Sequence, residues 1–89
     1  MFCVYLLESK QDGQLYTGFT KNLQKRLAEH NAGKEKATSP YVPWKCIYCE
    51  YCTNERDARR REKYLKTSQG GRLLKRRLKE YFYKKRSAD

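Results

Sequence analysis

The chain has 89 residues, of which 38% are hydrophobic and 35% are charged, so it is long enough for one domain with a modest core. Its 21 basic and 10 acidic residues give a net charge of +11, which favours a polyanionic partner, most simply nucleic acid. No apolar run approaches the length of a membrane span, and the N-terminus lacks a signal-peptide pattern. We therefore expect a cytoplasmic protein with no membrane partner.

Two extended segments around a turn signal open the chain. Residues 2–8 are apolar and rich in strand-forming residue types, and residues 14–20 form a second extended run. Between them, Asp12-Gly13 is a strong signal for a two-residue hairpin turn. The pattern therefore predicts an antiparallel hairpin.

Alternation along the two strands determines which side chains share a sheet face. With a two-residue turn, Tyr5 lies opposite Thr20 and Tyr16 lies opposite Ser9, whereas a looser loop brings the tyrosines closer; the sequence leaves this register open. A slip of two residues preserves the faces, but a slip of one exchanges them. One face then carries Cys3, Tyr5, Leu7, Tyr16, Gly18 and Thr20, and the other carries Phe2, Val4, Leu6, Leu15 and Phe19.

A helix is predicted directly after the hairpin. Thr20 or Asn22 can cap its N-terminus, and it runs to about Asn31, with Gly33 as the stop signal. The helix has one apolar stripe, which is formed by Leu23, Leu27 and Ala28.

Two polar residues of this helix, Arg26 and His30, lie four positions apart and therefore on one face, beside the apolar stripe. Taken singly, Arg26 is typical of a solvated charge. His30 is equally typical of a cation at a helix C-terminus, where the helix dipole favours positive charge.

A loop over residues 34–43 leads to an aromatic and β-branched run at residues 44–52, which predicts a third strand in the same sheet. The spacing of Cys46, Cys49 and Cys52 suggests a zinc site, but a strand places Cys46 and Cys52 on one face and Cys49 on the other. Zinc sites of this spacing usually form on turns, so we expect these cysteines to be free thiols that fill the core.

A second helix is predicted to begin near Thr53 or Asn54, and Ala58 and Leu65 mark its inward face. Glu62 lies on that same stripe, four residues after Ala58 and three before Leu65. A carboxylate at such a position is costly unless it is paired or binds a cation. A buried salt bridge to an arginine and a metal ligand are therefore both open interpretations of Glu62.

After a break at residues 67–71, apolar residues recur at helical spacing through a third helix that ends near Phe82. Residues 86–89 are predicted to form a frayed tail. The expected fold is α/β (α+β), with a three-stranded antiparallel sheet flanked by three helices in the order ββαβαα. It forms a single domain over residues 1–85.

In their order and spacing, these residues resemble the GIY-YIG nuclease domain, in its small stand-alone form and over nearly the whole chain. Cys3-Val4-Tyr5 stands where the family has Gly-Ile-Tyr, and Tyr16-Thr17-Gly18 stands where it has Tyr-Ile-Gly. Arg26, His30 and Glu62 match the helix arginine, a His-or-Tyr position and the metal-binding glutamate. Cys3 departs from the usual glycine.

The resemblance implies a metal-dependent endonuclease that hydrolyses DNA phosphodiester bonds, as DNA-repair members do. In this interpretation Tyr16 is the general base, Tyr5 orients groups or contacts phosphate, and His30 assists proton transfer. Arg26 stabilises the phosphate, and Glu62 binds one Mg²⁺ or Mn²⁺. Gly18 would be a structural residue. A non-catalytic nucleic-acid-binding module with the same fold is the alternative.

The expected partner is DNA, double-stranded or branched, bound with low sequence specificity. Lys21, Lys25, Arg59 and Lys63 are the candidate contacts, because they flank the predicted site on its two helices. If about four phosphates are neutralised, the log–log dependence of the binding constant on salt should have a slope of roughly −3 to −4. Binding titrations at several salt concentrations measure this slope, and an affinity that does not change with salt concentration would contradict the prediction.

Overall fold

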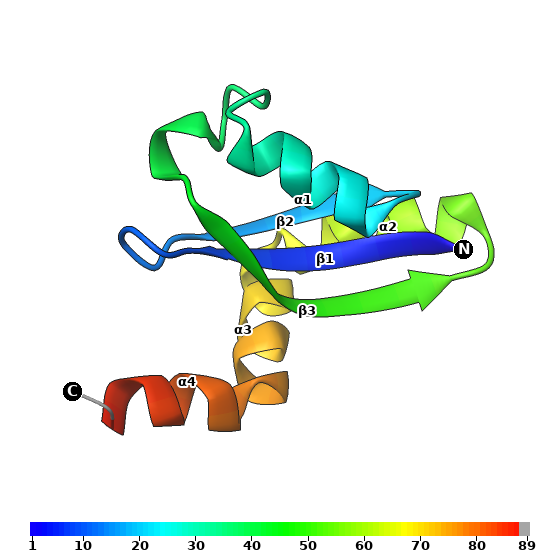
Figure 1. Cartoon of the computed structure of the whole chain (residues 1–89). Helices are drawn as coiled ribbons and strands as arrows, with labels where there is room; N and C mark the ends of the chain where they lie inside the picture. The colour runs from blue at the N-terminus through cyan, green and yellow to red at the C-terminus, as the bar shows by residue number, and fades with distance from the viewer. Residues whose placement is uncertain (88–89) are drawn as a thin grey trace.

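The computed structural model describes residues 1–87 and confirms the α+β fold class, with a three-stranded antiparallel sheet between helices (Figure 1). Strand β1 lies in the centre, with β2 and β3 at the edges. The elements in chain order are β1 (Phe2–Ser9), β2 (Leu15–Thr20), α1 (Leu23–Asn31), a short 3₁₀ helix (Ser39–Tyr41), β3 (Trp44–Cys52), α2 (Glu55–Leu65), α3 (Ser68–Arg77) and α4 (Lys79–Ser87).

The hairpin has a looser loop than a two-residue turn. Tyr5 pairs with Gly18 and Leu7 pairs with Tyr16, so the register is shifted by two residues from the one that a two-residue Asp12-Gly13 turn would impose. Because the shift is even, every side chain keeps its predicted face. The consequence is that Tyr5 and Tyr16 lie close together on one face, with ring centroids 6.4 Å apart.

Strand β3 contains a bulge that the sequence pattern did not reveal. Leu6 pairs with Tyr48 but Leu7 pairs with Cys46, which leaves Ile47 as the extra residue. The predicted faces of the cysteines are therefore wrong: Cys46 and Cys49 lie on one face and Cys52 on the other. All four cysteines of the chain are free thiols.

Each face of the sheet buries its own core. Helix α1 covers one face, whose buried residues are Cys3, Tyr5, Leu7 and Trp44. Helices α2 and α3 cover the other face, where the buried cluster is Val4, Leu6, Ala58, Leu65 and Leu74. The almost wholly apolar face of the hairpin is thus the one under α2, and the tyrosine face lies under α1 (Figure 1).

The helix ends follow local sequence signals. The side chain of Asn22 caps α1, and the side chain of Asn54 caps α2. Gly33 follows α1 with a φ of 75°, a conformation that favours glycine. Of the alternative caps that the sequence offered, the asparagine was selected in both helices.

The C-terminal region differs from the prediction of one helix after a break. Thr67 caps α3, so the helix starts within the predicted break. Gly70, in its first turn, must be small, because a Cβ there would lie 2.1 Å from the Tyr64 carbonyl oxygen. The predicted third helix is divided at Leu78 into α3 and α4, so the domain has four α-helices in residues 1–87. Residues 86 and 87 belong to α4, and the last two positions of the predicted tail lie outside the described residues.

A buried carboxylate ties α4 to the sheet. Glu8 of β1 is 1% exposed, and it accepts hydrogen bonds from the Tyr81 hydroxyl and, at 2.5 Å, from Lys85 Nζ. Lys45 Nζ lies 3.9 Å from the same carboxylate. The division at Leu78 turns α4 back along the end of the sheet, which brings Tyr81 and Lys85 to Glu8 (Figure 1).

Glu8→Gln should lower the free energy of unfolding at pH 7 by about 1–2 kcal/mol, because the charge-assisted bond to Lys85 is lost. Burial by itself raises a carboxyl pKa, but the hydrogen bonds from Lys85 and Tyr81 outweigh it and hold the pKa of Glu8 below 4.5. This stabilisation is complete above pH 4.5 and disappears as the pH falls through the folded-state pKa. Urea unfolding should therefore show a gap between the two proteins that closes in acid; a gap independent of pH would contradict the account.

None of the helices within residues 1–87 is long and apolar enough to cross a membrane.

Candidate active site

The side chain of Tyr5 leaves the central strand and crosses the neighbouring strand at Gly18. A Cβ at position 18 would lie 2.3 Å from the Tyr5 hydroxyl oxygen and 2.4 Å from Cζ, so only glycine leaves room for the ring. Tyr5 is 2% exposed, and its hydroxyl is held near the β2 edge of the sheet, under α1. The structural role predicted for Gly18 corresponds to this crossing.

A chain of three hydrogen-bonding groups starts at the Tyr5 hydroxyl. It lies 2.8 Å from His30 Nε2, and His30 Nδ1 lies 2.7 Å from Thr38 Oγ1. Thr38 Oγ1 donates its proton to the Glu35 carbonyl at 3.4 Å, so it accepts from Nδ1–H. We infer that the Nε2 of His30 is unprotonated and accepts the hydrogen bond of Tyr5.

Burial sets the protonation states in this chain. It raises the pKa of Tyr5 to about 12, although the guanidinium of Arg26 acts in the opposite direction. Burial, followed by the charge of Arg26, lowers the pKa of His30. His30 is completely buried and is not the exposed helix-end cation that its position in the sequence also allowed. A neutral His30 is the form that accepts a proton from Tyr5.

Two carboxylates hold the guanidinium of Arg26 in place. Glu29 accepts a hydrogen bond from Nη1 at 3.1 Å, and Glu35 accepts one from Nη2 at 2.6 Å. Although burial lowers the pKa of Arg26, the hydrogen bonds that it donates to Glu35 and Tyr5 outweigh this effect and raise the pKa, so the charge is permanent. The Arg26 side chain is still 27% exposed, so it is not the freely solvated charge that spacing alone would suggest.

Tyr16 stands on the more open side of the cluster. Its ring centroid lies 5.2 Å from that of His30, and Lys66 Nζ lies 5.5 Å from the Tyr16 centroid. The same Lys66 ammonium binds Glu62 Oε2 at 3.1 Å. The Glu62 side chain is 19% exposed and contributes to the charge environment of Tyr5. Side chains from β1, β2, α1 and α2 therefore converge beside the β2 edge.

The sequence of this chain matches the model of the GIY-YIG catalytic domain over residues 1–73. The chain belongs to the GIY-YIG family. The curated relatives of this GIY-YIG domain include UPF0213 proteins of three bacteria. The protein of Clostridium perfringens is 47% identical over 64 residues, which cover 71% of this chain and 68% of the relative.

Two further relatives extend this match along the GIY-YIG domain. The UPF0213 protein of Staphylococcus haemolyticus is 41% identical over 73 residues, covering 81% of this chain and 88% of the relative. That of Bacillus cereus is 34% identical over 84 residues, covering 93% of this chain and 80% of the relative. No solved structure matches the chain significantly. The family is one of nucleases, and the names of these relatives state no activity.

The donor set of the GIY-YIG domain limits the kind of metal ion that it can bind. No group of three or more His, Cys, Asp or Glu side chains within residues 1–87 is arranged to hold a metal. Glu62 offers one half-buried carboxylate, whose Oε1 forms no hydrogen bond to any other described residue. Mg²⁺ commonly binds through one or two carboxylates while water and substrate phosphate supply its other ligands. The residues therefore fit one such ion.

The ion pair of Glu62 is not the buried arginine bridge that was one interpretation of its position. Its partner is Lys66, whose side chain is 47% exposed. Ion pairs of this kind contribute about 0–1 kcal/mol, so stability alone does not account for a carboxylate on the inward stripe.

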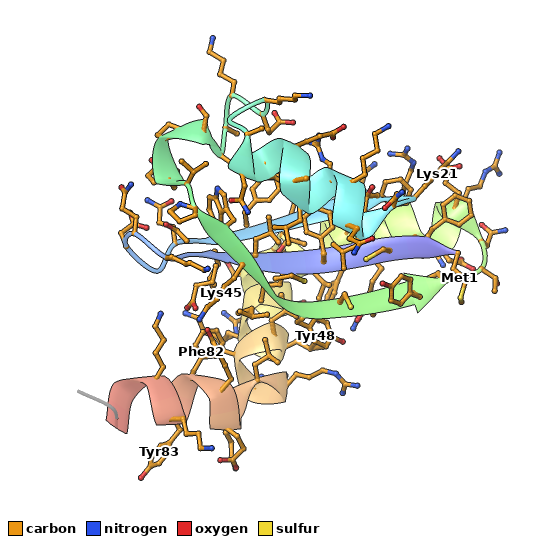
Figure 2. The ribbon with its side chains drawn as sticks, viewed as in Figure 1. Met1, Lys21, Lys45, Tyr48, Phe82 and Tyr83 are labelled. Carbon is orange, nitrogen blue, oxygen red and sulfur yellow. The ribbon has the colours of Figure 1, made fainter. Side chains whose placement is uncertain are left out.

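Two of the predicted DNA contacts, Lys21 and Arg59, lie over aromatic rings of the hairpin strands. Lys21 Nζ lies 5.8 Å from the Phe2 ring centroid, and Figure 2 shows Lys21 at the same end of the molecule as Met1. Arg59 lies over the Phe19 ring at 4.2 Å and pairs with Glu55. The other two predicted contacts, Lys25 and Lys63, are exposed on α1 and α2.

Several residues of the site were missed in the sequence. Lys66 and Glu29 carried a usable signal, since they lie four and three positions after Glu62 and Arg26 and are therefore helical neighbours. Glu35 and Thr38 carried no such signal, because a loop without periodicity brings them to α1. Only the path of residues 34–43 in three dimensions reveals their contribution.

Proposed function

We propose that this GIY-YIG protein is a metal-dependent endonuclease that hydrolyses DNA phosphodiester bonds. The observation that supports the proposal most is the convergence of Tyr5, Tyr16, Arg26, His30 and Glu62 from four separate elements at one edge of the sheet. Within residues 1–87, the Glu62 carboxylate pairs only with Lys66, whose side chain is 47% exposed, so a contribution to stability does not explain its place beside these residues. Phosphodiester hydrolysis needs a base for the attacking water, positive charge on the phosphate and help for the leaving oxygen, and these groups can supply such functions.

In this proposal the two tyrosines have different tasks. Tyr5 is buried, and its hydroxyl already contacts His30 and Arg26, so it positions these groups rather than meeting a water molecule directly. Tyr16 is half-exposed, and its hydroxyl forms no hydrogen bond to another residue within 1–87. Tyr16 therefore accepts the proton of the attacking water, and the Lys66 ammonium lies 5.5 Å from the centroid of its ring.

The charges in the site act on the phosphate. Arg26 is held by Glu29 and Glu35, so its remaining donors are oriented before the substrate arrives, which reduces the entropic cost of binding. Glu62 would hold a divalent ion, which would supply positive charge to offset the charge that develops on the phosphate oxygens. Neutral His30 can accept a proton from the Tyr5 hydroxyl at 2.8 Å. Tyr5 could therefore release its proton to His30 when phosphate binds to Arg26.

The direct test is incubation of the purified protein with supercoiled plasmid, with Mn²⁺ or Mg²⁺ and with excess chelator. Nicked and linear products that need the metal are the expected result. Plasmid binding without nicking in either metal would contradict the endonuclease and favour the non-catalytic binding module. The binding module is supported independently by the net charge of +11, because that charge favours nucleic-acid binding whether or not the protein cleaves its ligand.

Thr38→Val should lower kcat about tenfold with little change in KM, because the loss of Oγ1 removes the acceptor that keeps the proton on Nδ1 of His30. The buried Nδ1–H then lacks a partner, which should also cost about 1–3 kcal/mol of stability. Thr38→Ser keeps the hydroxyl and should restore both. The ¹⁵N shifts of the imidazole report the tautomer. An unchanged tautomer together with unchanged kcat would contradict the role of Thr38.

A further inference from the structure

Two adjoining hollows extend the candidate site along β2 towards α4. The inner hollow, about 420 Å³ in volume, is lined by Tyr16 and Lys66 and lies between β2 and α3. The outer hollow, about 980 Å³, lies between the β1–β2 loop and the α3–α4 corner. Leu15 and Lys75 line both hollows, so together they form one path, which we call the β2–α4 groove.

The rim of the outer hollow is positively charged. Glu8 contributes little negative charge, because Lys85 binds its carboxylate at 2.5 Å. The hollow has three further basic side chains, and no carboxylate within residues 1–87 forms an ion pair with any of them. These side chains are Lys75, Arg76 and Lys79. An anionic ligand would relieve the repulsion among them. The charged residues that line the outer hollow are Lys75, Arg76, Lys79, Lys85, Glu8 and Glu80.

The floor of the groove is apolar. Leu15, which lines both hollows, is 38% exposed on the edge strand, and Phe82 lines the outer hollow. Figure 2 shows Phe82 directed from α4 towards the sheet. Together with Tyr16 at the inner end, these side chains form an apolar track between cationic rims.

A groove with a basic rim and an apolar floor suits a single strand of nucleic acid better than a duplex. A duplex presents its phosphates outward and keeps its base faces stacked, so it would leave Leu15 and Phe82 uncovered. A single strand can place its bases on apolar and aromatic side chains while lysines track the backbone phosphates. The charge complementarity and the apolar floor of the groove therefore match a single strand.

We infer that the β2–α4 groove binds a single-stranded segment of nucleic acid that is continuous with the substrate at the candidate active site. The inference deepens the proposed function and rests on it, because it starts the strand at Tyr16. Lys75, Lys79 and Phe82 lie beyond residues 1–73, the region that matches the catalytic domain. The α3–α4 side of the outer hollow is thus supplied by residues beyond position 73, and the β1–β2 loop supplies the other side.

The test measures binding of labelled single-stranded and duplex oligonucleotides of equal length, in chelator so that cleavage cannot interfere. The test variant is Lys75→Gln with Lys79→Gln. Its matched control is Lys34→Gln with Lys36→Gln, which removes equal charge from an exposed loop outside the groove. A third variant, Leu15→Ser, alters the floor without changing charge.

The groove variant should bind the single strand about tenfold more weakly, and its log–log salt slope should be smaller by about 1.4, the value for two phosphates. Leu15→Ser should weaken single-strand binding in the same sense, and the control pair should change either affinity by less than about twofold. Equal losses for the groove and control pairs, or equal losses for duplex and single strand, would overturn the inference. Because binding is measured without metal, failure of cleavage would refute the proposed function alone.

Discussion

Glu62→Gln is expected to reduce metal-dependent cleavage by about 10²–10³-fold while the free energy of unfolding stays within about 1 kcal/mol of wild type. The amide keeps the shape of the side chain but removes the negative charge that, in the proposed function, would attract a divalent ion. The lost ion pair is with Lys66, which is 47% exposed, so its removal has little effect on stability. Nicking assays and urea unfolding measure the two quantities, and calorimetric Mn²⁺ titration provides a readout independent of activity.

Asp57→Asn is the matched control for this prediction. It also removes a carboxylate from α2 that pairs with a basic neighbour, Arg60, at 2.7 Å, but away from the site. Cleavage and Mn²⁺ binding should remain at wild-type levels. A Glu62→Gln protein that still cleaves would contradict the metal-ligand role. A loss of about 3–5 kcal/mol in stability would instead indicate a buried structural pair.

Gly18→Ala should lower cleavage activity nearly as much as Glu62→Gln does, but for a steric reason. The added Cβ would lie 2.3 Å from the Tyr5 hydroxyl oxygen, and the buried ring has no open space into which it can turn. Tyr5 must shift, which breaks its 2.8 Å contact with His30. We expect a loss of about 1–3 kcal/mol in stability and a fall in kcat of about 100-fold.

Gly71→Ala provides the comparison, because a Cβ at position 71 meets no atom within 4 Å and the residue lies in α3. It should raise the free energy of unfolding by about 0.5–1 kcal/mol and leave the contact between Tyr5 and His30 intact. Thermal unfolding and single-turnover cleavage distinguish the two variants. If Gly18→Ala were as stable and active as Gly71→Ala, Tyr5 would not cross β2 at position 18 in the folded protein.

Periodicity and capping chemistry made much of the fold predictable. The faces of Tyr5 and Tyr16 followed from strict alternation, and they survived a register two residues away from the shortest turn because only an odd slip exchanges faces. The limits of β3 followed from residue types, and for each of the first two helices the sequence offered two candidate caps, one of which was the observed Asn22 or Asn54. These features depend on local interactions, which a sequence displays directly.

The tertiary structure alone decided the features that depend on contacts between distant segments. The Tyr81–Glu8 hydrogen bond spans 73 residues, and the bulge at Ile47 arises from pairing with β1, so neither leaves a local pattern. The same is true of Thr38, which reaches His30 through an irregular loop. Sequence by itself determined which side chains of the hairpin share a face, and it offered Tyr5, Tyr16, Arg26, His30 and Glu62 as candidate groups of the site. Which of those groups touch was decided by the fold, because contact between them depends on the path of the whole chain.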